Sequence, residues 1–213
     1  MYPPAYFSDS ELDAALGIAG EAKFATFVVI DGGSILPIHV PVSLLPRDAW
    51  HGSQCPEFVG HIITSNPLFD ILKKSDWPAT VIFQPAEGYV SPGIYDEKRR
   101  SGKVVPTWNY VAAHFQGSLH LEQGDGALKN ILKTQIADYE GAVSGSWTID
   151  DAPADYIDKM ALAIAGFSFT ATGWKTIRKL SQNKPDERQN VTQWLDDNAL
   201  PASSISYCMR KAT

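Results

Sequence analysis

Four consecutive residues, Thr64-Ser65-Asn66-Pro67, have the types and the order that can bind an anion such as phosphate. Asparagine is a favoured N-cap and proline suits the first helical position, so the run predicts that a strand ends here and a helix begins. A helix N-terminus presents free backbone N–H groups and the positive end of the helix dipole. Ordinary helix capping by Asn66 explains the same residues without any ligand.

Three histidines, His39, His61 and His114, fall in three separate segments that predict strands. Histidine binds metals and can hydrogen-bond or transfer protons. No two of them have the close spacing of a metal-binding motif, so a metal triad would require three strands to converge. A partly buried histidine that hydrogen-bonds to the protein is the competing interpretation for each.

The run Trp108-Asn109-Tyr110 combines two aromatic rings, which can stack on a flat ligand, with an amide that both donates and accepts hydrogen bonds. Side chains alternate along a regular strand, so Asn109 faces one side while Trp108 and Tyr110 face the other. Either the amide or the aromatic pair can face a ligand, unless Pro106 marks a bulge. The alternative is that Trp108 and Tyr110 belong to the core.

Alternation and turn residues predict the elements that must position these side chains. Residues 38, 40 and 42 are apolar, so His39 is expected on the face opposite the core. The predicted strands cover residues 24–30, 35–43, 58–64, 77–83, 104–121 and 167–172, and the predicted helices cover residues 8–20, 66–74, 125–139, 153–165 and 185–198. Segment 85–102 is expected to be rich in turns, and Gly166 is expected to end a helix. Strands joined by short turns, with helices late in the chain, predict an antiparallel barrel or sheet of the α+β class.

The composition is that of an ordinary globular protein: of 213 residues, 44% are hydrophobic and 20% are charged. Domains of about 100 to 200 residues are typical, so we expect one domain covering residues 1–213. No apolar run approaches the roughly 18 to 20 residues of a membrane span, and no secretory signal is visible, so the cytoplasm is the expected location. Cys55 and Cys208 are far apart in the sequence, and both are expected to be free thiols.

The formal net charge of −6 argues against a surface that is attracted as a whole to nucleic acid. Basic residues nevertheless cluster in two runs, from Lys98 to Lys103 and from Lys175 to Arg188. Such clusters are either solvated faces or local contacts for an anionic partner. No helix-turn-helix, Rossmann or P-loop pattern accompanies them, and no serine or cysteine has the adjacent base of a nucleophilic catalyst.

Five segments follow one another along the chain: Met1–Phe7, Gly60–Pro67, Tyr89–Pro92, Val105–Tyr110 and Lys179–Asn183. In this order they resemble the PaiB family, small bacterial proteins described as FMN-binding negative transcriptional regulators. The resemblance spans nearly the whole chain. It implies an FMN-binding split barrel of the α+β class with peripheral helices, including helical additions at the C-terminus. It also implies a homodimer with the flavin in the subunit interface.

FMN is therefore the expected cofactor, and it needs an anion site for its phosphate, polar groups for its ribityl chain and a wall for its flat ring. The phosphate is expected near Thr64, Ser65 and Asn66, with Lys179 as a source of positive charge. The residues expected to bind the cofactor are His39, His61, Thr64, Ser65, Asn66, Trp108, Asn109, Lys179, Ser181, Gln182 and Asn183. No metal is expected, and no catalytic residue can be assigned.

Two positions depart from the family pattern. The family usually carries a basic residue where Thr64 stands and a lysine where Ile177 stands. An arginine pairs with phosphate through charge-assisted, often bidentate hydrogen bonds. This chain is therefore expected to bind FMN more weakly than its relatives unless Lys179 or Arg178 compensates.

Three functions compete at this point. The first is a flavoprotein, either an FMN-dependent oxidoreductase or a regulator, in which FMN performs electron or hydride transfer. The second is a transcriptional repressor that binds DNA directly, for which no recognition helix is visible. The third is a split barrel that has lost FMN and binds another planar ligand such as haem. The substrate or electron donor cannot be assigned from the sequence.

Overall fold

The computed structural model describes residues 4–51, 55–124, 126–198 and 209. The contacts within the chain define two compact units. The first comprises Met1–Ala22, Phe83–His114 and Trp174–Thr213, and the second comprises Lys23–Ile82 and Phe115–Gly173. Three strands, β4, β5 and β6, contribute residues to both units.

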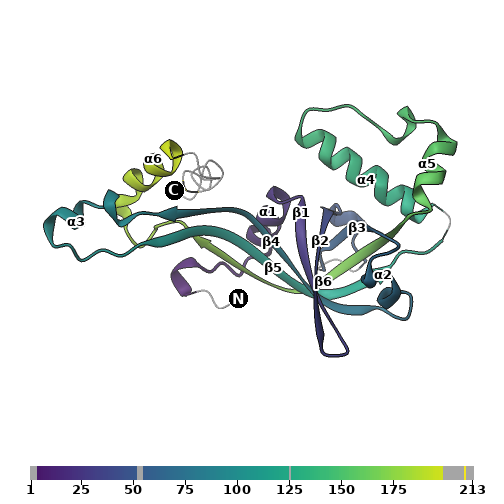
Figure 1. The fold of residues 1–213 in the computed structure, drawn as a ribbon, viewed down its shortest axis with the longest axis horizontal. Coiled ribbons are helices and arrows are strands. Elements are labelled where there is room, and N and C mark those ends of the chain that lie inside the picture. The colour runs from purple at the N-terminus through teal and green to yellow at the C-terminus, as the bar shows by residue number, and fades with distance from the viewer. Residues whose placement is uncertain (1–3, 52–54, 125, 199–208, 210–213) are drawn as a thin grey trace. The chain divides into compact units, whose positions relative to one another are not determined.

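Six strands form a closed barrel in the order β1-β2-β3-β6-β5-β4 (Figure 1). Strand β1 pairs antiparallel with β2 and β4, β2 pairs with β3, and β3 pairs with β6. The strands are β1 (Phe24–Asp31), β2 (Ser34–Leu44), β3 (Glu57–Ile63), β4 (Trp77–Val90), β5 (Thr107–Leu121) and β6 (Ile164–Lys179). The helices are α1 (Leu12–Glu21), α2 (Pro67–Leu72), α3 (Asp96–Arg100), α4 (Ala127–Ala142), α5 (Ala154–Ala161) and α6 (Arg188–Asp197). The predicted α+β barrel with peripheral helices is confirmed.

A two-residue turn joins β1 to β2. Asp31 pairs with Ser34, and the glycines between them, Gly32 and Gly33, have φ angles of 54° and 86°. A type I′ hairpin turn requires positive φ at both central residues, which glycine adopts without steric cost. The strands predicted over residues 24–30 and 35–43 are confirmed and form a hairpin. Burial of residues 38, 40 and 42 leaves His39 on the exposed face, as expected.

Five phenylalanines form the centre of the second unit. Phe27 meets Phe167 and Phe169 edge to face, with 5.4 Å between ring centroids in each pair. Phe58 meets Phe115 in the same way at 5.1 Å. Such aromatic pairs contribute about 0.5 to 1.5 kcal/mol beyond the burial of their surface. This cluster fixes which faces of β1, β3, β5 and β6 point inward.

Helix α4 lies outside the barrel and contacts β2 and β3 (Figure 1). It also lies over Gly166 of β6, where an added Cβ atom would be 2.7 Å from Ile131 Cδ1. The prediction that Gly166 ends a helix is wrong, because α5 ends at Ala161 and β6 begins at Ile164. The close approach of α4 explains the glycine, and this tertiary contact leaves no local pattern in the sequence.

Strand β4 is longer than predicted and continues to Val90. The beginning of the predicted turn-rich segment 85–102 is therefore wrong. Pro85 hides the strand in the sequence, because proline cannot donate a ladder hydrogen bond. Burial alternates on both sides of Pro85 but shifts by one position there: residues 79, 81 and 83 are buried before it, and residues 86, 88 and 90 after it.

Helix α1 begins at Leu12, later than the predicted start at residue 8, and it runs through both of its glycines to Glu21. No helix in the described part of the chain is long and apolar enough to cross a membrane. Cys55 is a free thiol, as expected, and Cys208 lies outside the described residues.

Candidate functional site

A pocket of about 270 Å³ lies in the second unit between β2 and the start of α2. Residues 36–39 line one side, and Asn66 and Pro67 line the other. His39 is exposed, and its Nδ1 atom lies 2.9 Å from Thr26 Oγ1 on β1. Two of the residues predicted to bind the cofactor, His39 and Asn66, thus line one pocket.

The junction of β3 and α2 has the predicted form of a strand that leads into a capped helix. The Asn66 side chain accepts a hydrogen bond from the backbone N–H of Leu68 at 3.0 Å, and Pro67 is the first helical residue. The backbone N–H and the hydroxyl of Thr64 both donate to Ala163 O, at 2.9 and 3.3 Å. Ser65 is exposed. Capping accounts for Asn66, and an anion site at this junction stays a prediction.

His61 lies on β3 and contacts α4. Its Nδ1 atom is 2.7 Å from Oε1 of Gln135, whose side chain is 2% exposed. The Gln135 amide nitrogen donates to Pro41 O at 3.0 Å and to the Tyr139 hydroxyl at 2.8 Å. Sequence reasoning missed this amide, although a signal existed: Gln135 stands four residues after Ile131 and four before Tyr139, on the apolar stripe of a helix.

Asn109 and Ser181 form a buried pair in the first unit, with exposed fractions of 0% and 4%. The Asn109 amide nitrogen donates to Ser181 Oγ at 2.9 Å, and Oγ lies 3.2 Å from the amide oxygen. Ser181 has a φ of 59°, which is uncommon for a residue other than glycine. The pair joins β5 to the turn that follows β6.

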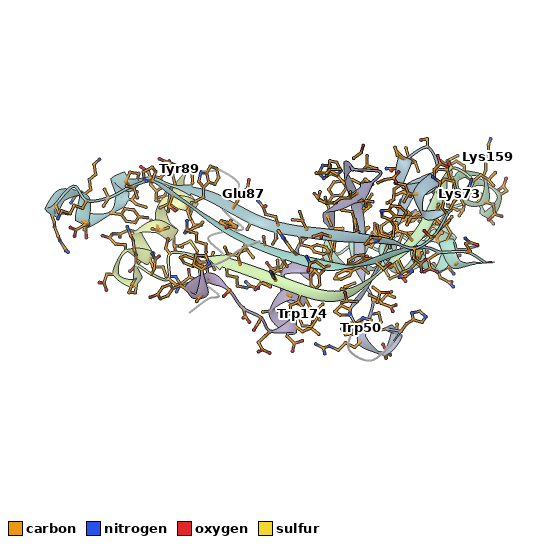
Figure 2. All side chains as sticks on the ribbon, turned by 90° about the horizontal axis from the view of Figure 1, so that it is seen from below. Trp50, Lys73, Glu87, Tyr89, Lys159 and Trp174 are labelled. Atoms are coloured by element: carbon orange, nitrogen blue, oxygen red, sulfur yellow. The ribbon has the colours of Figure 1, made fainter. Side chains whose placement is uncertain are left out.

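Trp108 faces the side of β5 opposite Asn109, as alternation predicts, and is 53% exposed. Its ring meets Tyr89 of β4 nearly edge to face at 6.0 Å, and Tyr89 meets Trp194 of α6 at 6.3 Å. Figure 2 labels Tyr89 on β4. The interpretation of Trp108 as a core residue is wrong, and its exposed ring is available to a flat ligand.

Three predicted residues of the first unit remain, Lys179, Gln182 and Asn183, and they belong to the end of β6 and the turn after it. Lys179 Nζ donates to Thr107 Oγ1 at 2.6 Å. The Gln182 side chain accepts from the backbone N–H of Leu180 at 2.7 Å and donates to Tyr6 O at 3.3 Å. Asn183 is exposed. Gln182 therefore stabilises the turn.

The eleven predicted residues thus fall into two groups. His39, His61, Thr64, Ser65 and Asn66 belong to the second unit, and the six others belong to the first. Within the described residues, no three side chains of His, Cys, Asp or Glu are grouped so that they could hold a metal ion.

A second polar pocket in the second unit, of about 290 Å³, was not predicted. His51 and Glu57 line it together with Glu122, Ser168 and residues of α4. Glu57 is 2% exposed, and its carboxylate accepts from the His51 backbone N–H at 2.7 Å and lies 2.9 Å from His51 Nδ1. The hydrogen bond with Glu57, together with its charge, raises the pKa of His51 above 6.5. The two residues are six positions apart, and Glu57 is the first residue of β3. This spacing matches no motif.

Comparison with known proteins places this chain in a family. Residues 1–173 match the model of a family described as "Putative FMN-binding domain". The chain is 25% identical over 202 residues to the protease synthase and sporulation protein PAI 2 of Bacillus subtilis. The aligned residues cover 94% of this chain and 92% of that protein.

Two solved structures share the fold at low sequence identity. A conserved hypothetical protein from Mycobacterium tuberculosis has a TM-score of 0.58 and 13% identity, covering 87% of this chain and 94% of its own. A FAD and heme binding protein from Mycobacterium smegmatis has a TM-score of 0.54 and 14% sequence identity. The match covers 81% of this chain and 73% of that protein. The predicted split barrel is confirmed by these likenesses, which concern the fold alone.

Proposed function

Because this chain belongs to the family of FMN-binding domains, with FMN as its cofactor, we propose that it is a redox flavoprotein with an enzymatic or regulatory role. The observation that carries the proposal is the family match over residues 1–173. When bound, the flavin ring supplies electron or hydride transfer, which side chains do not perform. The protein binds and orients the cofactor and limits its exposure to water.

We assign the phosphate end of FMN to the pocket between β2 and α2. Asn66 and His39 line this pocket, and the exposed hydroxyl of Ser65 adjoins Asn66. Hydroxyl and imidazole groups can both donate hydrogen bonds to phosphate oxygens. Thr64 brings no charge, and its hydroxyl is engaged by Ala163, so the site has polar groups but no paired cation of its own.

The exposure of the pocket supports a dimer. Small-molecule sites usually bury most of the ligand's surface. Pro37, His39 and Pro67 of the pocket lining are exposed, so one chain leaves a ligand there open to solvent. A second copy of the chain would cover the flavin ring. A light-scattering mass equal to one 23.3 kDa chain, measured with FMN present, would contradict this assembly.

The absorption spectrum of the purified protein tests the cofactor. We expect flavin bands, and denaturation should release FMN that chromatography identifies by its phosphate. A Soret band, or the release of haem, would favour the alternative that the barrel holds another planar ligand. A colourless protein that does not take up added FMN would refute the proposal.

Direct binding to DNA is the second candidate. It is favoured by one observation: Lys98, Arg99 and Arg100 lie together in the last turn of α3, and none of them is buried. The overall charge of −6 opposes it, because an acidic protein must concentrate its positive charge to bind a duplex.

A further inference from the structure

We infer that the hydrogen bonds of Gln135 on α4 fix the tautomer of His61, with the proton on Nδ1 and the lone pair on Nε2. The residues of this network are His61, Gln135, Tyr139 and Pro41. All four belong to the second unit. The tautomer follows from the structure alone, and its use in ligand binding rests on the proposed function.

Tyr139 is the first contact of the Gln135 amide on α4. Its hydroxyl oxygen accepts from the Gln135 side-chain nitrogen at 2.8 Å, which places that nitrogen on the Tyr139 side.

A second and independent contact fixes the same orientation of Gln135. The backbone oxygen of Pro41 lies 3.0 Å from the atom assigned as Nε2, and a carbonyl oxygen can only accept. A flipped amide would place two oxygens against each other in a buried position. Oε1 must therefore face His61 at 2.7 Å, and because this oxygen only accepts, His61 Nδ1 must carry a proton.

The neutral His61 ring consequently presents Nε2 as an acceptor. Among the described residues, the protein supplies no partner for this atom. A ligand that hydrogen-bonds to this atom must offer it an N–H or O–H group. In FMN the ring N–H and the ribityl hydroxyls are donors, whereas the phosphate oxygens and ring carbonyls accept. Gln135 is thus a positioning residue that directs His61 toward the ring or ribityl portion of the cofactor and away from its phosphate.

Nitrogen-15 NMR of the histidine side chains tests the tautomer in flavin-free protein. At pH about 8, where an ordinary imidazole is neutral, we expect His61 to show a protonated Nδ1 and a bare Nε2. Gln135→Leu should abolish this preference. Tyr139→Phe should keep it, since Pro41 still orients the amide. A proton on Nε2 of His61 in the wild type would overturn the inference, as would its persistence on Nδ1 in Gln135→Leu.

Titration with FMN and with riboflavin tests the last step. Loss of one positioned hydrogen bond should weaken both ligands by a similar factor in Gln135→Leu, roughly ten-fold, because they share the ring and the ribityl chain. Gln193→Leu, at an exposed position on α6, is the matched control and should change neither affinity. A loss restricted to FMN would place His61 at the phosphate and refute this step. Failure of the wild type to bind either flavin would refute the proposed function, while the NMR result would still decide the tautomer.

Discussion

Thr64→Arg should strengthen the binding of FMN by restoring a cation beside its phosphate. The substitution removes the Thr64 hydroxyl bond to Ala163 O, at 3.3 Å a long hydrogen bond, and keeps the backbone bond at 2.9 Å. The lost bond contributes about 0.5 kcal/mol to stability, the low end for a neutral hydrogen bond. This loss is the same in the free and bound protein, so it does not reduce affinity. A hydrogen bond to a charged group contributes about 1.5 to 3 kcal/mol, which corresponds to roughly ten-fold to a hundred-fold tighter binding.

Quenching of flavin fluorescence measures the affinities of wild type, Thr64→Arg and Thr64→Val. The valine variant removes the same hydroxyl without adding charge, so we expect it to bind FMN as the wild type does. Riboflavin lacks the phosphate, and its affinity should be similar in all three proteins. The assignment of the phosphate fails if Thr64→Arg leaves FMN affinity unchanged, or if it raises the affinities of FMN and riboflavin by equal factors.

Three further outcomes are expected. Asn109→Ala and Ser181→Ala should each lower the free energy of unfolding, measured by urea titration, by about 1 to 3 kcal/mol, because each leaves a buried polar partner unpaired. If the losses of the two single variants simply add in the double variant, this pairing is contradicted. Glu57→Gln should lower the pKa of His51, because it removes the charge that raises it, and an NMR titration of the His51 side chain measures this pKa. Since the pKa of His51 is raised in the folded protein, the stabilisation from this pair is complete below pH about 6.5 and disappears as the pH rises through the folded pKa. If His51 titrates in Glu57→Gln as it does in the wild type, Glu57 is not the cause. The protein should bind duplex DNA weakly at physiological salt. If it instead binds a defined operator tightly, and alanine at residues 98–100 abolishes that binding, the result would support a direct repressor.

Local sequence patterns predicted the parts of the barrel that local chemistry determines. The glycines after Asp31 require positive φ, and Asn66-Pro67 forms a helix cap, so the first hairpin and the start of α2 were predicted correctly. Gly166 was misinterpreted because its reason lies in α4, a segment distant along the chain. The extension of β4 was missed because Pro85 normally indicates the end of a strand.

The candidate site was harder to predict because ligand binding and structural support use the same residue types. Asn109 lies within residues 1–173, which match the family, and Gln182 lies in a segment that resembles it. The structure gives both of them hydrogen bonds within the protein. Gln135 could have been noticed as a polar residue on an apolar helical stripe, but its partners on β2 and β3 could not be known from spacing. The pairing of His51 with Glu57 joins positions six residues apart, and neither helical nor strand periodicity predicts a contact at that spacing.

Helix α5 has a consequence for the local stability of the second unit. Its eight residues include no buried side chain, and an isolated helix of this length is marginal in water. Little tertiary packing therefore opposes fraying of α5, whereas the strands of the phenylalanine cluster open only when the core does. Amide hydrogens of α5 should exchange with solvent deuterium through local opening, at rates insensitive to mutations that change global stability. Exchange measured along the chain would separate this independently opening helix from the cooperative barrel.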